Sequence, residues 1–227
     1  MKITVLGTGI VGQTLAAKLA SLGHDVRIGT RDPAATLARS EPGQYGNPSF
    51  RDWAAANPKV RVATFADAAA HGEIVLNALS GAGTLAALEL AGADRLAGKI
   101  LLDISNPLDF SKGFPPSLLV ANTDSLGEQI QRRFPATRVV KTLNTVSAHL
   151  MVDPGQLAGG DHTMFVAGDD ADARRQVSGW LREWFGWKDV IELGDITQAR
   201  GMEMYLPLWV RVFGAVQTPT FSIRVVR

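Results

Sequence analysis

The 227-residue chain is predicted to fold as an α/β protein built on a doubly wound parallel sheet. Apolar, strand-like segments alternate with segments whose apolar residues recur at helical spacing, and this alternation favours parallel strands joined by right-handed crossover helices. A glycine-rich segment, residues 7–12, directly follows the first strand and opens the first helix. Hydrophobic residues make up 46% of the chain and charged residues 20%, which is typical of a globular protein and excludes wholesale disorder.

Six strands are predicted in the first 150 residues. The first helix carries apolar residues at helical spacing from Val11 to Leu22 and ends at Gly23. Ser125 and Glu128 have the spacing of a capping box and predict another helix. The predicted strands cover residues 2–6, 25–29, 60–63, 73–77, 99–103 and 138–142, with helical stretches near Thr36, Ala66 and Leu85 between them.

The alternation continues once more in residues 151–227, which we interpret as a smaller C-terminal α/β extension of the larger unit 1–150. A strand over 163–167 is followed by a helix that turns Val177 and Trp184 inward, and then by a strand over 190–193. The last helix, from Gln198 to about Phe213, is apolar on most faces. Core packing, a homodimer interface and a wall of an acceptor pocket all explain such a helix.

Two stretches are predicted to be loops. Residues 41–50 contain two prolines and two glycines and indicate a surface loop inserted into the second crossover. Residues 104–116 follow the fifth strand directly and contain the Asn106-Pro107 pair. A long loop inside a compact domain is more often functional than idle, so we expect this loop to contribute to a site.

Charge and cysteine content exclude several function classes. The 23 basic and 22 acidic side chains give a net charge of +1, so we expect no nucleic-acid partner and no attraction to an anionic membrane. The chain has no cysteine, which removes disulfides and thiolate metal sites and is compatible with the cytoplasm. The first apolar run stops at Gly7, too early for a signal peptide, and no segment approaches the length of a membrane span.

The glycine-rich segment has the G-x-G-x-x-G pattern of dinucleotide-binding Rossmann folds. Gly7 permits the tight turn, Gly9 lets the backbone approach a pyrophosphate, and Gly12 permits close packing of helix on strand. Phosphates would then lie on unpaired N–H groups at the positive end of the helix. The residues predicted to bind the cofactor here are Gly7, Thr8, Gly9, Ile10, Val11 and Gly12.

The end of the second strand favours NADP over NAD. NAD enzymes usually place an acidic residue there to hold both ribose hydroxyls, whereas this chain has Thr30 followed by Arg31. A hydroxyl and a guanidinium suit a 2′-phosphate, because the guanidinium forms charge-assisted hydrogen bonds with phosphate oxygens. Alternatively, Arg31 pairs with Asp32 on a solvated turn. The missing acid also disfavours an S-adenosylmethionine enzyme.

Further candidate cofactor residues follow the fourth, fifth and sixth strands, whose carboxyl ends point at the ligand crevice of such a sheet. Their amides and hydroxyls are suited to bond the ribose and the carboxamide of a nicotinamide, although a structural turn or cap role stays open for each. These residues are Ala78, Leu79, Ser80, Asn106, Asn144, Val146 and Ala148.

No catalytic acid or base can be assigned from the sequence. Neither Tyr45 nor Tyr205 has a lysine four residues on, so the Tyr-x-x-x-Lys pair of short-chain dehydrogenases is absent. Lys141 and His149 bracket the end of the sixth strand and are the remaining candidates for proton transfer. The four histidines lack the spacing of metal ligands, so no metal is expected. Hydride transfer between two cofactors needs no such side chain.

With these residues in place, the chain resembles the NADPH-dependent reductases of the deazaflavin coenzyme F420. It is also similar to the cytosolic reductase domain of six-transmembrane metalloreductases. The first resemblance rests on Gly7-Thr8-Gly9 with Gly12, Gly23-His24, Ile28-Gly29-Thr30-Arg31, Asn106-Pro107 and residues 143–148. The second rests on Asp103-Ile104-Ser105-Asn106, Val146-Ser147-Ala148, Leu193-Gly194-Asp195, Ala199-Arg200, Glu203 and Leu206-Pro207.

The resemblance implies a function for each part of the chain. Thr8, Thr30 and Arg31 would hold the 2′-phosphate of NADP(H), and residues 144–148 would place the nicotinamide against the second cofactor. Residues 1–150 would form the NADP-binding Rossmann domain, and residues 151–227 the acceptor-site and dimerisation region of a homodimer. Deazaflavin reductases often have histidine where this chain has Asn144, which leaves coenzyme F420, FMN and FAD open as acceptors.

Three functions are therefore carried forward from the sequence. The first is an NADP(H)-dependent oxidoreductase that exchanges hydride with a deazaflavin or a flavin. The second is an imine or carbonyl reductase that uses Lys141 or His149. The third, from a different class, is a non-catalytic NADP(H)-binding sensor.

Overall fold

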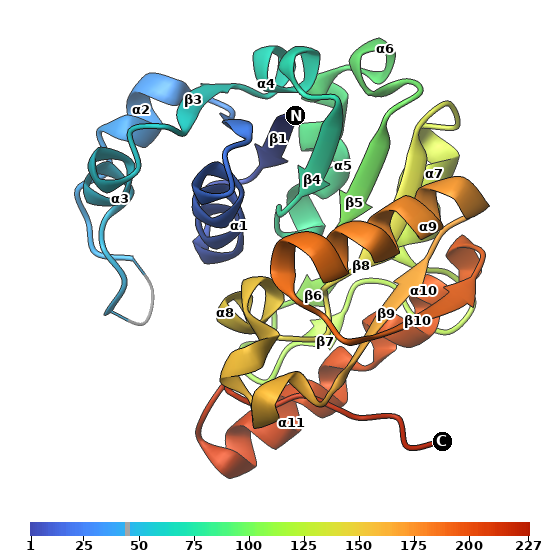
Figure 1. Ribbon diagram of the computed structural model, residues 1–227. Helices are drawn as coiled ribbons and strands as arrows, with labels where there is room; N and C mark the ends of the chain where they lie inside the picture. Colours follow the sequence, from blue (N-terminus) through green and yellow to red (C-terminus); the bar gives the residue numbers. More distant parts are fainter. Residues whose placement is uncertain (44–45) are drawn as a thin grey trace.

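The computed structural model describes residues 1–43 and 46–227 (Figure 1). Its centre is an eight-stranded sheet of β1 (Lys2–Leu6), β2 (Asp25–Thr30), β3 (Arg61–Thr64), β4 (Ile74–Asn77), β5 (Ile100–Asp103), β8 (Arg138–Thr142), β9 (Thr163–Ala167) and β10 (Asp189–Gly194). The strands lie in the order β3-β2-β1-β4-β5-β8-β9-β10, and every neighbouring pair is parallel except β8 and β9. The first six strands have the order of a doubly wound dinucleotide-binding sheet, which confirms the predicted fold class.

Helices cover both faces of the sheet, so that nearly every strand is buried on two sides. Side chains alternate along β1, where Val5 joins one apolar core and Leu6 the other. The first core is shared with α1 (Ile10–Ser21), α3 (Phe50–Ala56), α8 (Ala148–Val152) and α9 (Ala171–Trp180). The second is shared with α4 (Phe65–His71), α5 (Gly81–Ala91), α6 (Ala93–Leu96) and α7 (Leu126–Arg133).

The C-terminal strands β9 and β10 extend the same sheet and are parallel to each other. The division of the chain at residue 150 stays a prediction. The remaining short elements are α2 (Pro33–Leu37), β6 (Leu108–Asp109), β7 (Ser117–Leu118), the 3-10 turns η2 (Pro154–Gln156), η3 (Ala158–Gly160) and η5 (Ile196–Gln198), the π-turn η4 (Leu181–Phe185), α10 (Ala199–Met204) and α11 (Leu206–Val216).

Three predicted segments differ in the structure. The expected loop over 104–116 contains β6, which pairs with β7 in a small antiparallel ladder. The expected single helix from Gln198 to Phe213 is two helices, α10 and α11. They separate at Tyr205, because Pro207 in the first turn of α11 has no N–H to continue the bonding of α10. The expected loop over 41–50 gives way to α3 at Phe50, and its residues 44–45, with Tyr45, lie outside the described residues.

The capping box that opens α7 ties this helix to the C-terminal region. The Glu128 N–H donates to Ser125 Oγ (3.1 Å), as the sequence predicts. Two guanidinium nitrogens of Arg200, on α10, donate to the Glu128 carboxylate at 2.6 and 2.9 Å. Hydrogen bonding from Arg200 is the largest influence on the pKa of Glu128 and holds it below its ordinary value. This mostly buried pair therefore fastens α10 to α7.

Replacing Glu128 by Gln should lower the free energy of unfolding at pH 7 by about 1–3 kcal/mol, because the neutral amide keeps one acceptor oxygen where the carboxylate accepted two hydrogen bonds from a charged donor. The depressed pKa means that the carboxylate stabilises the fold above the unfolded-state pKa, about 4.3, and that this contribution disappears as the pH falls through the lower folded-state value. Urea denaturation of wild type and E128Q from pH 7 to pH 3 should show the two midpoints converging in acid.

The control is Glu89→Gln, which removes the partner of Arg133 in an exposed ion pair (2.7 Å) and should change stability by less than about 1 kcal/mol. A difference between wild type and E128Q that stays constant down to pH 3 would contradict this account.

Candidate cofactor-binding site

The glycine-rich segment forms a tight turn between β1 and α1. Gly7 has a φ of +115°, and a Cβ there would lie 2.5 Å from the Ala78 carbonyl oxygen. A Cβ on Gly12 would overlap the carbonyl oxygen of Gly7. A Cβ on Gly9, by contrast, would meet no described atom within 4 Å. Packing therefore requires glycine at positions 7 and 12, whereas the space beside Gly9 suits the approach of a ligand.

The first turn of α1 offers unpaired backbone donors beside this space. Gly9 is the N-cap residue, and no side chain of the described residues caps the helix. Its first N–H groups and the positive end of the helix dipole therefore face the turn, an arrangement that favours a phosphate. Gln13 braces the turn by donating to the Thr8 carbonyl oxygen (2.9 Å). The residues present thus fit a pyrophosphate.

The residues predicted to recognise a 2′-phosphate lie at the end of β2. Thr30 is buried, and its hydroxyl lies 2.8 Å from that of Thr36. Arg31 is exposed and forms no ion pair with a described residue, Asp32 included. Asp32 instead accepts a hydrogen bond from the Ala35 N–H and caps α2. The alternative of a solvated Arg31–Asp32 pair is therefore not what the structure contains.

The carboxyl ends of β4 and β5 meet, as predicted. Ala78 and Leu79 are half-buried behind the glycine turn, and the exposed Ser80 is the N-cap residue of α5. A Cβ on Gly81 would overlap the carbonyl oxygen of Asn106, so the segments after β4 and β5 are in direct contact.

Asn106 and Asn144 bind each other across the ends of β5 and β8. The Asn106 amide donates to the Asn144 carbonyl oxygen (2.9 Å), and the Asn144 amide donates to Asn106 Oδ1 (2.9 Å) and to the Met202 carbonyl oxygen (3.0 Å). Leu143 before it is buried with a φ of +61°, a strained value for a non-glycine residue. The surrounding contacts thus hold this turn in one shape.

Two buried oxygens in this turn have no hydrogen-bond partner among the described residues, Asn144 Oδ1 and Thr145 Oγ1. Buried polar atoms nearly always have a hydrogen-bond partner. Since these two lie beside a predicted ligand position, we infer that a bound ligand supplies the missing partner. Asn144 Oδ1 and the Thr145 hydroxyl are suited to hydrogen bonds with the amide of a carboxamide. The residues present therefore fit the polar substituent of a nicotinamide ring.

The remaining predicted residues of this turn lead into α8. Val146 is buried and Ala148 is the first residue of the helix. His149 is half-buried, and its Nε2 lies 3.1 Å from the hydroxyl of Thr220 in the C-terminal segment. The Ser147 hydroxyl donates to the Pro219 carbonyl oxygen (2.7 Å). The C-terminal segment therefore packs against α8. His149, which the sequence left as a candidate acid or base, is already hydrogen-bonded to this segment.

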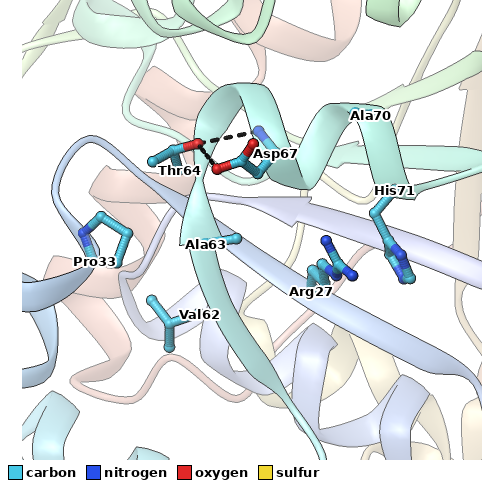
Figure 2. Close-up of a pocket in the computed structure, with 8 residues that line it drawn as sticks. All are labelled: Arg27, Pro33, Val62, Ala63, Thr64, Asp67, Ala70 and His71. Carbon is cyan, nitrogen blue, oxygen red and sulfur yellow. Dashed lines mark hydrogen bonds between the residues drawn. The ribbon is translucent and has the colours of Figure 1, made fainter.

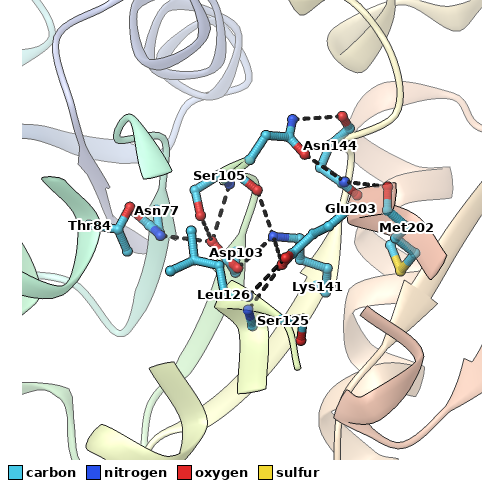
Figure 3. A network of polar contacts seen from close by, with 12 residues as sticks. Asn77, Thr84, Asp103, Ser105, Ser125, Leu126, Lys141, Asn144, Met202 and Glu203 are labelled. Atoms are coloured by element: carbon cyan, nitrogen blue, oxygen red, sulfur yellow. Dashed lines mark hydrogen bonds and ion pairs between the residues drawn. The ribbon is translucent and has the colours of Figure 1, made fainter. Parts of the chain in front are cut away.

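Lys141, the other candidate, lies at the centre of a buried charge network (Figure 3). Its ammonium is fully buried between two carboxylates, Asp103 Oδ2 at 2.9 Å and Glu203 Oε1 at 2.8 Å. It also donates to the Ser105 carbonyl oxygen at 2.6 Å. Asn77 donates to Asp103 Oδ1 (2.7 Å). The three donors of the ammonium are thus matched by three acceptors.

Burial alone would lower the pKa of Lys141, but the charges of Asp103 and Glu203 outweigh it and hold the pKa above its ordinary value. The lysine stays protonated and enclosed, so the structure gives it a positioning role. Glu203 also accepts hydrogen bonds from the N–H groups of Leu126 (2.8 Å) and Gly127 (3.0 Å), at the start of α7. Sequence reasoning did not single out Glu203 as part of this site, because no spacing links it to a strand 62 residues earlier.

Two hollows border this part of the molecule. One, of about 390 Å³, lies against the glycine turn and is lined by Thr8, Gly9 and Gln13. The other, of about 560 Å³, lies beside the edge strand β3, where Thr64 Oγ1 donates to Asp67 Oδ2 at 2.7 Å (Figure 2). None of the predicted cofactor residues lines the larger hollow. Of the predicted cofactor residues, Thr8, Gly9 and Ile10 line the smaller hollow.

The comparisons with known proteins identify the family of the chain. Residues 2–107 match the family described as NADP oxidoreductase, coenzyme F420-dependent. An F420-dependent NADP reductase of Methanothermobacter marburgensis is 30% identical over 217 residues, which cover 93% of this chain and 92% of that protein. The chain belongs to this family. It is therefore an NADP-dependent oxidoreductase, as the sequence predicted.

Two further relatives are similar to this chain. A crystal structure from Arthrobacter sp. FB24, named as a candidate F420-dependent NADP-reductase, is 59% identical over the whole of both chains with a TM-score of 0.96. Rat metalloreductase STEAP3 is 29% identical over 214 residues, but this chain spans 38% of its length. No helix in the described part of this family member is long and apolar enough to cross a bilayer.

The two glycine environments generate a first prediction for the site. Gly9→Ala should leave the melting temperature within about 2 °C of wild type, because its Cβ enters open space. NADPH affinity should nevertheless fall at least about tenfold, because the methyl group occupies the approach of the pyrophosphate. Gly12→Ala should destabilise the fold itself, since its Cβ overlaps backbone. Thermal melts and NADPH titrations separate the two effects, and a Gly9→Ala protein that binds NADPH normally would refute the assignment.

The charge network generates a second prediction. Lys141→Met fills the space but leaves Asp103 and Glu203 buried without their counter-ion, so the free energy of unfolding should fall by about 3–5 kcal/mol. Lys99→Met is the control, because that ammonium is less deeply buried and donates to one carbonyl oxygen, of Ala69 (2.7 Å). Denaturant titration of both variants measures the difference, and equal losses would contradict a special role for Lys141.

Proposed function

We propose that this chain transfers hydride between NADP(H) and a deazaflavin of the coenzyme F420 type, with FMN or FAD as the alternative acceptor ring. The observation that carries the proposal is the turn around Asn144, where orphaned buried oxygens meet the carboxyl edge of the sheet. The M. marburgensis relative is named for F420-dependent NADP reduction, which supports the deazaflavin as the first acceptor.

The predicted residues divide between the two ends of the cofactor. The glycine turn and the first turn of α1 would hold the pyrophosphate, and Thr30 and Arg31 would lie toward the adenosine. The turn at 143–148 would orient the nicotinamide. When bound, the two groups would supply the redox chemistry, which is hydride transfer from NADPH to an acceptor ring that would also take up a proton from solvent.

No side chain needs to exchange a proton in this reaction, which agrees with the surroundings of each candidate. Lys141 donates to three acceptors and is sealed from solvent. His149 is bound to Thr220. These surroundings argue against the imine or carbonyl reductase that the sequence left open.

The C-terminal region is proposed to complete the acceptor side of the site. Met202 on α10 accepts the hydrogen bond from the Asn144 amide, so the helix reaches the turn where the nicotinamide would lie. On α11, Trp209 stacks on Phe213 (5.7 Å between ring centroids) and on Phe221 (5.0 Å). An apolar, aromatic surface of this kind suits a flat ring system. A homodimer through this region also stays a proposal.

The test is anaerobic oxidation of NADPH with coenzyme F420, FMN, FAD and riboflavin offered separately. Turnover with F420 is expected to exceed turnover with any flavin. Turnover with a flavin alone would assign the chain to the flavin alternative. If a folded protein that binds NADPH reduces none of the four acceptors, the proposal is overturned and the sensor is favoured.

A variant distinguishes the proposed reaction from proton-transfer chemistry. His149→Ala should change kcat with F420 by less than about threefold, because a lost general acid or base would cost about a hundredfold or more. The same assay on Tyr205→Phe should give the same result. Loss of turnover in either variant, with NADPH affinity intact, would instead support an imine or carbonyl reductase mechanism.

A further inference from the structure

The hollow against the glycine turn is also lined by residues for which no cofactor role was predicted. Thr8, Gly9 and Gln13 line it from the turn and from α1, and Arg39 and Phe50 line it from the segments after α2 and at the start of α3. Arg39 follows α2, and Phe50 opens α3. A ligand with its pyrophosphate on the glycine turn would extend its adenosine half along this hollow, because the end of β2 lies on the same side of the sheet.

Arg39 is held in place beside this hollow by three contacts. Its Nη2 donates to Thr8 Oγ1 at 2.8 Å, and its Nε donates to the Thr36 carbonyl oxygen at 3.4 Å. Its guanidinium carbon lies 4.9 Å from the centroid of the Phe50 ring, within range of a cation–π interaction. Thr36 in turn bonds the hydroxyl of Thr30. One guanidinium therefore connects the end of β2 to the glycine turn.

The charge of Arg39 is not neutralised by a carboxylate. Glu41 lines the same hollow, but no ion pair forms between Arg39 and any acidic residue that the structure describes. A fixed guanidinium whose hydrogen-bond partners are one hydroxyl and one carbonyl oxygen retains donors for an anion. Arginine in this setting binds phosphate by charge-assisted and often bidentate hydrogen bonds.

We propose that Arg39, with Thr8, binds the 2′-phosphate of NADP(H) and is the main determinant of preference for NADP(H) over NAD(H). This inference rests on the proposed function. Both arginines are exposed, but Arg31, the residue predicted from the sequence, does not line the hollow. Arg39 already has its fork anchored beside the phosphate turn, so it loses less conformational freedom on binding than Arg31 does.

A merely structural Arg39 would behave differently. If it served only to hold residues 39–43 against the glycine turn, its removal would weaken NADPH and NADH alike, because both cofactors would occupy that hollow. If it binds the 2′-phosphate, its removal affects only the cofactor that carries this group. The ratio of the two dissociation constants therefore separates the roles.

The experiment measures dissociation constants of NADPH and NADH by fluorescence titration for wild type, Arg39→Gln and Arg31→Gln. Arg39→Gln should weaken NADPH about ten- to a hundredfold and NADH less than about twofold. Arg31→Gln should have the smaller effect on the ratio. The control is Arg51→Gln, which removes an exposed cation from α3 that pairs with Asp52 and should change neither constant.

Equal weakening of both cofactors by Arg39→Gln, or a larger change of the ratio in Arg31→Gln, would overturn the inference. If Arg39→Gln does not fold, Arg39→Lys decides, because lysine keeps the charge but not the planar fork or the stacking on Phe50. A reduced NADPH preference then supports the assignment, and an unchanged one overturns it. Failure of the proposed function is a separate result, since wild type would then bind NADPH without passing hydride to any acceptor.

Discussion

The buried ammonium of Lys141 is the interaction on which the arrangement of the site depends. A charge at this depth is tolerated only when its counter-charges and hydrogen-bond partners are fixed around it. Asp103 at the end of β5 and Glu203 on α10 fulfil this requirement, and Glu203 also holds the first N–H groups of α7. Four elements far apart in sequence must therefore assemble in one geometry before the lysine can be enclosed.

The same elements carry the polar residues of the site. Asn106 follows β5, Asn144 follows β8, and the Asn144 amide reaches the backbone of α10 beside Glu203. Hydrophobic packing fixes the distance between layers but tolerates small slips, whereas a buried charge network penalises them directly. The strained Leu143 is held within this frame. The ion network around Lys141 would thus fix the orientation of a ring that binds at this edge of the sheet.

The parts of the fold that the sequence could predict are those that depend on local patterns of residues. The glycine turn, the strands and the Ser125–Glu128 cap each depend on neighbours along the chain, and the structure contains all of them. The contacts of Glu203 and Arg39 depend on which segments meet in space, and no residue spacing in the sequence predicts those contacts. The break at Tyr205 follows from Pro207, which the prediction of a single helix did not take into account. The pairing of β6 with β7 involves two residues in each strand, too short a pattern for periodicity to detect.

The two ends of the site follow different physical rules. A phosphate needs accessible, mostly unneutralised positive charge, so its ligands belong on exposed segments such as the one that carries Arg39. A nicotinamide ring is selected by orientation rather than by charge, so it requires neutral groups whose positions are fixed. Buried amides and hydroxyls above a sealed ion network meet that need. We therefore expect changes of cofactor preference to come from the segment after β2, where substitution costs little stability. Changes of acceptor are expected to come from residues of α10, which reaches the Asn144 turn, Glu203 excepted because it belongs to the ion network.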